Sequence, residues 1–189
     1  MGNSIILIGP SCAGKSTIGA LLGKQLKWPV VELDELRWNY YAEIGYDAEY
    51  AKTIRNEQGF EALAAYWKPF DIHGLERVLT DYPDNHVLSL GAGISIYDDE
   101  ERMQRARKAL ESFGRVVLLL PSPNQEECIN ILEQRLREKL PNPSSGLLAV
   151  NRSFVGHPSN AELAKITIYS AEQTPEKTCE TIIQALNLP

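Results

Sequence analysis

The segment "GPSCAGKST", residues 9–17, has the residue types and the spacing of a loop that binds a chain of phosphates. Gly9 and Gly14 allow the backbone to approach phosphate oxygens closely, at the start of a helix whose dipole favours an anion. Lys15 is expected to reach the β- and γ-phosphates, and the Ser16 hydroxyl to bind Mg²⁺. We therefore predict that the loop binds ATP with Mg²⁺, the remaining contacts coming from Ser11, Cys12, Ala13 and Thr17.

Two carboxylates stand at the end of the next apolar segment, in "ELDEL" at 32–36. Asp34 follows that segment directly, and we expect it to face the phosphate loop, where it would orient an attacking hydroxyl and accept its proton. Glu32 lies two residues earlier and would point the same way, toward a Mg²⁺-bound water. The alternative is that both acids only favour the start of a helix, where the dipole stabilises negative charge.

Missing motifs narrow the class of nucleotide-binding protein. The chain has no Asn-Lys-x-Asp motif, which regulatory GTPases use to read guanine, and no Asp-x-x-Gly follows a predicted strand. The segment "VLSLGAG" at 87–93 also lacks the carboxylate with which motor and chaperone ATPases end the corresponding strand. These features favour a small kinase, in which the loop serine, the nucleotide and water hold Mg²⁺.

Short apolar segments alternate with helical patterns along the chain. Strands buried on both faces of a parallel sheet read as nearly continuous apolar runs, and three of the segments do so. The alternation predicts an α/β fold, a three-layer α/β/α sandwich of the nucleoside-kinase-like P-loop NTPase type, with five parallel strands in the order 2-3-1-4-5 and the site at their carboxyl ends. The predicted strands are "SIILIG" (4–9), "PVVEL" (29–33), "HVLSL" (86–90), "RVVLLL" (115–120) and "ITIY" (166–169).

Two connections are too long for simple crossovers. Residues 35–85 have a mostly helical pattern and are predicted to form a helical insert that binds the phosphate acceptor. Residues 140–158 are rich in Pro, Ser and Gly and are predicted to be a mobile lid loop. Helices are predicted to start at "SPNQ" (122–125) and "SNAE" (159–162), which have the pattern of capping boxes, and at "TP" (174–175).

The composition is that of one globular domain spanning residues 1–189, with 43% hydrophobic and 23% charged residues. The net charge of -6 argues against a nucleic-acid partner, and no apolar run is long enough to cross a membrane. Cys12, Cys128 and Cys179 lack metal-ligand spacing, so we expect a reduced, cytoplasmic setting. A thiol at a helix N-terminus can be redox-sensitive, but we favour a role for the Cys12 backbone alone.

Taken together, the loop at 9–17, "ELD" at 32–34 and "VLSLGAG" at 87–93 resemble the shikimate kinases. The resemblance continues through "RVVLLLPSP", the helical segment "ILEQRLRE" and the closing "ITIYSAEQTPEKTCETIIQAL", and so covers most of the chain in order. It implies transfer of the γ-phosphate of ATP to a hydroxyl of a small metabolite. Two alternatives stay open: a nucleoside or nucleotide kinase, and a non-catalytic ATP-binding module that recognises a protein.

On the nucleotide side, the resemblance implies that Lys15 and Ser16 serve ATP and Mg²⁺. Arg135 or Arg137 would approach ATP as the lid closes, unless both belong to a solvated helix face. Pro175 would pack near adenine.

On the acceptor side, the resemblance implies that Asp34 binds the hydroxyl and acts as the base, while Gly91 and Gly93 let the acceptor approach the backbone. Two residues depart from the family pattern. Glu32 replaces the first Asp of an Asp-x-Asp pair, and Ala92 replaces the middle residue of three glycines. The alanine narrows the space beside the acceptor by one methyl group.

A larger departure concerns the arginines with which shikimate kinases clamp the acceptor carboxylate. No arginine stands at the position expected for the first, and Lys68 and Arg77 are out of register. Lysine does not replace arginine in bidentate carboxylate binding. For the second, Arg152 is the nearest candidate to contact substrate, although His157 is closer to the expected offset. The acceptor need not be shikimate.

The segment 37–80, between the second and third predicted strands, is also rich in aromatic residues. It holds nine of the fifteen in the chain. They would form the core of a helical cap, which we favour, or line an apolar acceptor pocket. These residues are Trp38, Tyr40, Tyr41, Tyr46, Tyr50, Phe60, Tyr66, Trp67 and Phe70.

Overall fold

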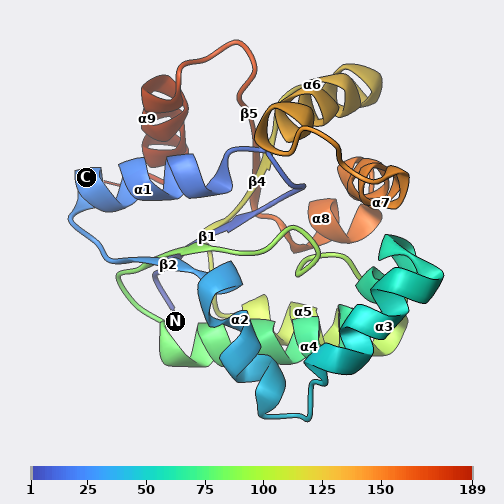
Figure 1. Cartoon of the computed structure of the whole chain (residues 1–189). Coiled ribbons are helices and arrows are strands. Elements are labelled where there is room, and N and C mark those ends of the chain that lie inside the picture. Colours follow the sequence, from blue (N-terminus) through green and yellow to red (C-terminus); the bar gives the residue numbers. More distant parts are fainter. Residues whose placement is uncertain (1, 189) are drawn as a thin grey trace.

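Five parallel strands form a single sheet in the order β2-β3-β1-β4-β5, which confirms the predicted order (Figure 1). The structure, a computed structural model, describes residues 2–188. The strands are β1 (Ile5–Ile8), β2 (Val30–Glu32), β3 (Val87–Ser89), β4 (Val116–Leu120) and β5 (Ile166–Tyr169). Leu7 of the central strand β1 is in register with Ser89 on one side and Val117 on the other.

Helices cover both faces of the sheet. On one face lie α1 (Lys15–Leu26), α6 (Gln125–Lys139) and α9 (Pro175–Ala185), and on the other lie α4 (Phe60–Asp81), α5 (Glu100–Leu110) and α8 (Pro158–Leu163). Side chains of β1 alternate between the two cores, Ile5 and Leu7 facing the first and Ile6 and Ile8 the second. All four are at most 1% exposed, as expected for a strand covered on both sides. The three-layer sandwich is therefore confirmed.

The segment 35–85 is helical, as its pattern predicts. It holds the rest of α2 (Leu33–Ala42), followed by α3 (Ala48–Gln58) and α4. Gly59, with φ at +89°, separates α3 from α4. Although α4 has 22 residues, no helix within residues 2–188 combines the length and the apolar character needed to cross a bilayer. The role of the segment in binding an acceptor stays a prediction.

The aromatic residues of this segment pack mainly on one another. Tyr46 is the centre of the cluster, with ring centroids 5.4 Å from Trp38, 5.8 Å from Tyr66 and 5.2 Å from Phe70. They form the core that joins α2, α3 and α4, which agrees with the first of the two interpretations. Phe60 and Trp67 also line a cavity described below.

Residues 140–158 are not the loop that their composition predicts. They contain α7 (Ser145–Val155), whose N-cap Ser144 accepts a hydrogen bond from the amide of Leu147. The loop-forming residues are confined to the start of the segment. Beyond them, Leu147, Val150 and Phe154 recur at helical spacing and face the cavity beside α4. Whether α7 acts as a lid stays a prediction.

Two of the predicted helix starts are misplaced. The N-cap of α6 is Asn124 and that of α8 is His157, because the hydroxyl groups at the predicted caps are used elsewhere. Ser122 bonds the Glu127 carboxylate at 2.5 Å, and the buried Ser159 donates to Ser95 O at 2.8 Å. The start of α9 is as predicted, with Thr174 as the cap and Pro175 in the first turn.

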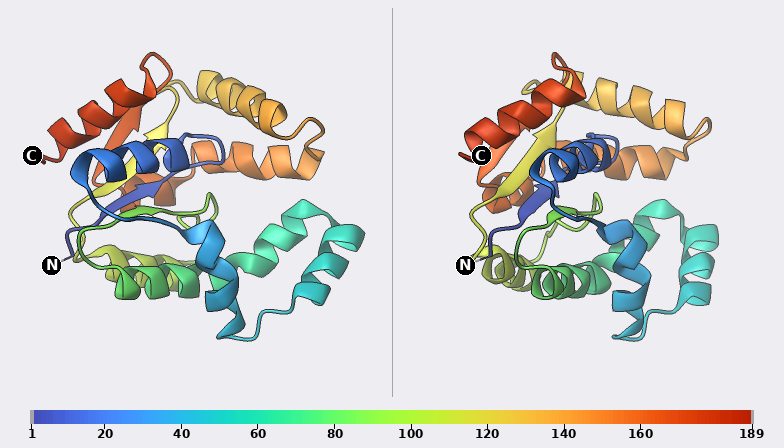
Figure 2. Two further views of the ribbon diagram at one scale, coloured as in Figure 1. Left: turned by 60° about the vertical axis from the view of Figure 1, so that its left-hand side comes forward. Right: turned by 90° about the vertical axis from the view of Figure 1, so that its left-hand side faces the viewer.

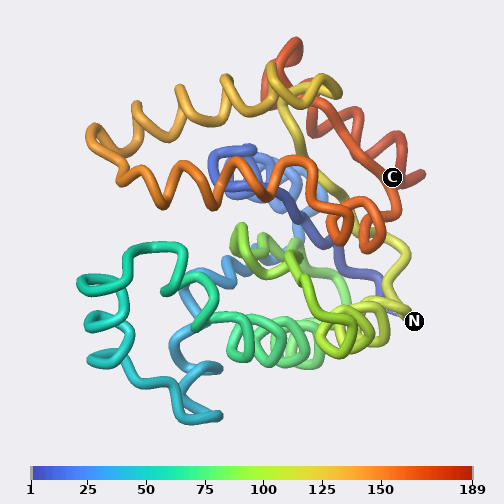
Figure 3. Tube along the Cα trace, turned by 90° about the vertical axis from the view of Figure 1, so that its right-hand side faces the viewer, coloured from blue at the N-terminus to red at the C-terminus, as the bar shows by residue number. Residues whose placement is uncertain are grey.

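Two groups of helices extend past the carboxyl ends of the strands. Figures 2 and 3 show α6 with α7 on one side of that edge and the α2–α3–α4 segment on the other. The connection from β1 to α1, which carries the phosphate loop, lies beside α6 and α7 (Figure 2). Because α4 and α7 pack against each other, the two groups enclose the space in front of the loop.

Candidate active site

At two positions the phosphate loop has a backbone conformation that only glycine adopts readily. Gly9 has φ at +137°, and a Cβ on it would lie 2.5 Å from the carbonyl oxygen of Leu119 in β4. Gly14 has φ at +102° and caps α1. Both residues lie in the left-handed region where other residues are strained. The glycines at these two positions therefore shape the loop, as their spacing indicates.

Lys15 lies folded over this loop. Its Nζ donates to Gly9 O at 2.8 Å and to Pro10 O at 2.9 Å. Burial lowers the pKa of the Lys15 ammonium to about 8, although Asp34, Cys12 and Glu32 act to raise it. The ammonium thus rests on neutral carbonyl oxygens, from which it can turn to a phosphate.

Ser16 and Glu32 meet across α1 and β2. The Ser16 Oγ donates to Glu32 Oε2 at 3.1 Å, although the two residues lie far apart in the sequence. Oxygen donors of this kind suit Mg²⁺, which keeps several waters when it binds beside a phosphate. The pair therefore fits the predicted metal site, with Ser16 as a direct ligand and Glu32 able to hold a water.

Asp34 lies in the first turn of α2 and faces the loop that follows β3. Its Oδ1 is 2.6 Å from the point where a Cβ on Gly91 would lie, and 3.2 Å from Nη1 of Arg37. The side chain is 63% exposed. The position of Asp34 in the first turn of α2 agrees with the helix-start interpretation. An acid at a helix start can also face a ligand, and the role of Asp34 toward an acceptor hydroxyl stays a prediction. Gly91 leaves room for the carboxylate.

A cavity of about 130 Å³ opens beside Asp34. Its walls come from the phosphate loop, α2, α4, α7 and the segment after β3, and we call it the acceptor cavity. Of the predicted acceptor residues, it contains Asp34, Ala92 and Gly93. Its lining residues are Ser11, Asp34, Arg37, Phe60, Ala64, Trp67, Lys68, Asp71, Ala92, Gly93, Leu147, Val150, Asn151 and Phe154.

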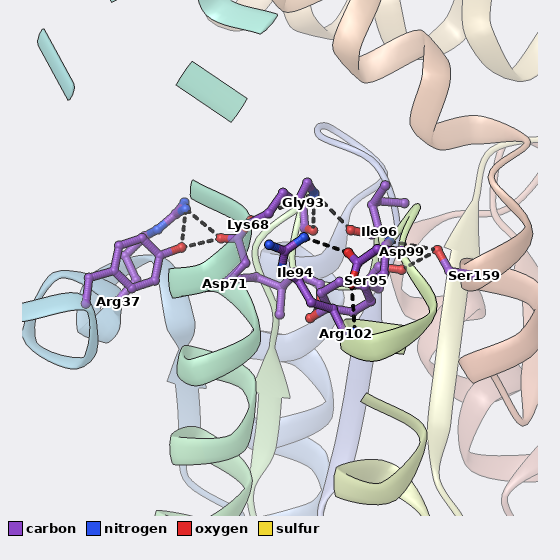
Figure 4. A network of polar contacts seen from close by, with 12 residues as sticks. Arg37, Lys68, Asp71, Gly93, Ile94, Ser95, Ile96, Asp99, Arg102 and Ser159 are labelled. Atoms are coloured by element: carbon purple, nitrogen blue, oxygen red, sulfur yellow. Dashed lines mark hydrogen bonds and ion pairs between the residues drawn. The ribbon is translucent and has the colours of Figure 1, made fainter. Parts of the chain in front are cut away.

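Four polar side chains form a network beside this cavity, and three of them line it. We call Arg37, Tyr41, Lys68 and Asp71 the Asp71 cluster. Figure 4 shows Arg37, Lys68 and Asp71 beside the backbone at Gly93. Asp71 Oδ1 accepts from Tyr41 and, at 3.2 Å, from Arg37. Lys68 Nζ donates to the carbonyls of Gly93 at 3.1 Å and Ile96 at 2.9 Å. Burial raises the pKa of the Asp71 carboxyl, against the opposing effect of Arg37 and Lys68.

A second cavity, of about 280 Å³, lies on the other side of the phosphate loop, and we call it the base cavity. It is lined by the loop residues Cys12 and Gly14, by Thr17, and by Arg135 and Pro175. Arg135 Nη1 donates to Cys12 O at 3.3 Å. The structure therefore brings Arg135 and Pro175 together at the loop, with Cys12 using its carbonyl group.

Two predicted arginines lie away from both cavities. Arg137 is exposed and lines a surface depression formed by α6 alone. Arg152 is exposed and pairs with Glu133 of α6 at 2.5 Å. Successive residues of a helix point in different directions, so Asn151 faces the cavity and Arg152 does not. The structure therefore brings neither arginine to a cavity, and their roles stay predictions.

The other candidates for an acceptor clamp are also occupied elsewhere. Arg77 pairs with Glu43 and Asp81, each at 3.2 Å. His157 contacts the exposed Asp98 at 2.9 Å. Lys68, out of register in the sequence, does reach the acceptor cavity.

Sequence reasoning missed Arg37, Asp71 and Asn151. Asp71 is 2% exposed, and a lone acid within the apolar sequence "FDIHGL" was a usable signal. Arg37 follows Asp34 by one helical turn, which places the two on one face. Asn151 gave no signal, because its partner is the backbone of the distant Ser11.

A phosphate loop with one cavity lined by Arg135 and Pro175 and another lined by Asp34 is the arrangement expected of a P-loop kinase of small molecules. The family model described as shikimate kinase matches residues 11–187. The chain belongs to the shikimate kinase family. It is an ATP-dependent kinase that uses Mg²⁺.

Curated relatives agree with this assignment. The chain is 29% identical to a shikimate kinase of Enterococcus faecalis over 196 residues, which cover 97% of this chain and 98% of the relative. It is 25% identical to a shikimate kinase of Pseudomonas aeruginosa over 185 residues, 97% of this chain and 95% of the relative.

Two solved structures share the fold. A shikimate kinase from Acinetobacter baumannii in complex with shikimate has a TM-score of 0.65 at 19% identity, over 99% of this chain and 94% of that one. A gluconokinase from Sinorhizobium meliloti has a TM-score of 0.64 at 16% identity, over 98% of this chain and 92% of the gluconokinase chain.

Proposed function

We propose that the protein transfers the γ-phosphate of ATP to a hydroxyl of a small metabolite bound in the acceptor cavity, as a shikimate kinase-like enzyme. One observation carries the proposal: Asp34 and Ser11 of the phosphate loop line the same cavity, while the base cavity lies on the opposite side of that loop. A nucleotide with its base in the second cavity would direct its terminal phosphate toward the first.

The residues have the following roles in this proposal. Lys15 and the loop amides bind and neutralise the phosphates, and Arg135 approaches them from α6. Ser16 and Glu32 would hold Mg²⁺, which would offset the charge of the phosphates. Asp34 orients the acceptor hydroxyl and takes its proton. Positioning and electrostatics of this kind account for most of the catalysis of phosphoryl transfer.

The size of the acceptor cavity supports a small acceptor. Its volume of about 130 Å³ is well below the range of roughly 300–1,000 Å³ for pockets that hold drug-sized ligands. The aromatic residues mostly pack on one another, which leaves little surface on which a nucleoside could stack. We therefore favour a small metabolite over a nucleoside. Closure of α7 would exclude water, which otherwise competes as the acceptor.

The test is ADP release in the presence of shikimate, gluconate, nucleosides and aminoglycoside-like alcohols. At least one alcohol is expected to raise the rate above its basal value, and Lys15→Ala to abolish the increase. Asp34→Asn should abolish turnover but leave ATP binding nearly unchanged. Normal transfer by Asp34→Asn would contradict the role of this carboxylate. ATP binding that no alcohol converts to turnover would favour the non-catalytic binding module.

A further inference from the structure

The charged groups that line the acceptor cavity balance one another. Building on the proposed function, we infer that the acceptor is an uncharged polyhydroxylated compound, of the sugar-alcohol or cyclitol kind, and that one of its hydroxyls donates to Asp71 Oδ2. The inference concerns the class of acceptor, which the phosphate loop and Asp34 leave open.

Both cations of the cavity are already paired. Arg37 lies 3.2 Å from Asp34 and 3.2 Å from Asp71, so its charge is shared between two carboxylates. Lys68 Nζ lies 3.8 Å from Asp71 Oδ2. The two positive charges therefore face two negative ones, and the lining has no net charge.

Lys68 is also fixed in place. Its hydrogen bonds to the carbonyls of Gly93 and Ile96 join α4 to the segment after β3 (Figure 4). Its side chain is only 16% exposed. Turning toward a ligand would break both hydrogen bonds. The carbonyl of Gly93 would keep the bond that it accepts from Ile96 N at 3.2 Å, but that of Ile96 would lose its donor, which is costly for a buried group. Burial also lowers the pKa of the Lys68 ammonium, which weakens it further as an anion site.

Among residues 2–188, an acceptor carboxylate would find no unpaired cation in the lining of this cavity. Arg102, a further arginine near Lys68, pairs with Asp99 at 2.6 Å. Lys15 belongs to the phosphate end. A carboxylate in the cavity would lie beside Asp34 and Asp71 and would lose its hydration without gaining a counter-ion. Such burial of an unpaired charge is strongly unfavourable.

Hydroxyl groups fit the same surface. Asp71 Oδ2 accepts no hydrogen bond from residues 2–188, because its contact with Lys68 is beyond hydrogen-bond distance. It lies beside Gly93, which also lines the cavity, since a Cβ on Gly93 would lie 3.5 Å from this oxygen. A polyol can donate one hydroxyl to Asp71 and present another to Asp34. The rings of Trp67 and Phe154 would cover its C–H groups.

A site that hydrogen-bonds a hydroxyl discriminates strongly against an analogue without that donor. The test therefore uses pairs of compounds that differ only in CH₂OH against carboxylate: glycerol with glycerate, erythritol with erythronate, and glucitol with gluconate. Shikimate and its methyl ester form a further, cyclic pair, in which a neutral ester replaces the carboxylate. ADP release is measured for each. In at least one pair the neutral member should have a kcat/KM at least tenfold higher; a preference for the carboxylates would overturn the inference.

Asp71→Asn tests the charge balance directly. The variant keeps the shape of the side chain and leaves Arg37 and Lys68 with one uncompensated positive charge. The ratio of kcat/KM for carboxylate over neutral alcohol should rise at least tenfold. Asp81→Asn removes the same charge from α4 outside the cavity, where Asp81 contacts Tyr40 and Arg77, and should leave the ratio unchanged. An unchanged ratio in a folded Asp71→Asn would also overturn the inference.

A binding measurement keeps the inference separate from the proposed function and from the folding of the variant. Titration calorimetry of the wild-type protein with a non-hydrolysable ATP analogue should detect glucitol or erythritol but not gluconate or erythronate. Binding of the polyol without ADP release would support the inference and contradict the kinase. Binding of a carboxylate with ADP release would support the kinase and contradict the inference. Binding of neither class would overturn the assignment of a polyol to the cavity.

Discussion

Asn151 of α7 holds the backbone of Ser11 in the phosphate loop through two hydrogen bonds. Its Oδ1 accepts from Ser11 N at 2.7 Å, and its Nδ2 donates to Ser11 O at 3.3 Å. Asn151 is 3% exposed, so this contact is shielded from water. The helix that we expect to act as a lid is thereby attached to the loop that binds phosphate.

Asn151→Ala should loosen that attachment. Loss of the buried hydrogen bonds is expected to lower the free energy of unfolding by about 1–3 kcal/mol, as measured by urea denaturation. It should also raise ADP release without an acceptor relative to ADP release with one, because water enters when α7 is not held. Ser153→Ala is the control, since its hydroxyl bonds only Val150 O within α7. If Asn151→Ala lowers stability but leaves the ratio of ADP release without acceptor to ADP release with acceptor unchanged, then Asn151 has only a structural role.

Gly91→Ala should reduce turnover with little effect on stability. The new Cβ would fall 2.6 Å from Asp34 Oδ1, and the exposed carboxylate can move away at small cost to the fold. Displacing a catalytic group by about 1 Å costs on the order of 100-fold in rate. We expect a fall in kcat of about 10- to 100-fold with a nearly unchanged KM for ATP.

Gly114→Ala is the matched control, because a Cβ there meets no atom within 4 Å. It should leave kcat unchanged. Wild-type turnover by Gly91→Ala would show that the position of Asp34 in the structure is not the one that matters for transfer.

The pair of Ser16 and Glu32 predicts a particular Mg²⁺ dependence. Glu32→Gln keeps an oxygen near Ser16 but removes the charge, so the Mg²⁺ concentration for half-maximal ADP release should rise about 10- to 100-fold, as for other residues that orient metal ligands. Saturating Mg²⁺ should restore most of the activity. The control is Glu35→Gln, an exposed acid of α2. A loss of kcat that Mg²⁺ does not restore would argue for a different role of Glu32.

The sheet could be predicted from the sequence because each strand is a local signal. The runs around Ile5 and Val116 are almost wholly apolar, and the parallel order follows from the alternation with helices. The helix α7 was harder to predict from the sequence. Pro141 and Pro143 indicate a loop, but both precede the helix, which begins at Ser145. Composition averages over a segment, whereas a helix depends on where the apolar residues recur.

The site could be predicted only where one segment carries the chemistry. The phosphate loop and Asp34 lie next to predicted strand ends, so their positions follow from the fold. The choice between Arg135 and Arg137 depends on which side of α6 packs against the sheet. The Asp71 cluster depends on how α2 and α4 cross, and contacts between distant segments leave no spacing in the sequence to detect.

The buried ammonium of Lys15 predicts how stability depends on pH. Its pKa is about 8 in the folded protein against 10.5 for an ordinary lysine, so the unfolded chain binds more protons between these values. The free energy of unfolding therefore rises as pH increases through this window, and the cost of burying the charge is greatest below pH 8. Lys15→Met cannot titrate at this position. Relative to this variant, the free energy of unfolding of the wild type should increase by about 2 kcal/mol between pH 7 and pH 10.

Urea denaturation without nucleotide at each pH measures this difference, and Lys24→Met, which removes an exposed lysine from the same helix, controls for the loss of a lysine charge. A constant difference across the window, or one of opposite sign, would show that Lys15 is not buried as a charge. ATP should reverse the effect, because its phosphates favour the charged ammonium and raise its pKa. ATP binding should consequently take up a proton near pH 8.5, which calorimetry in two buffers of different ionisation enthalpy would detect.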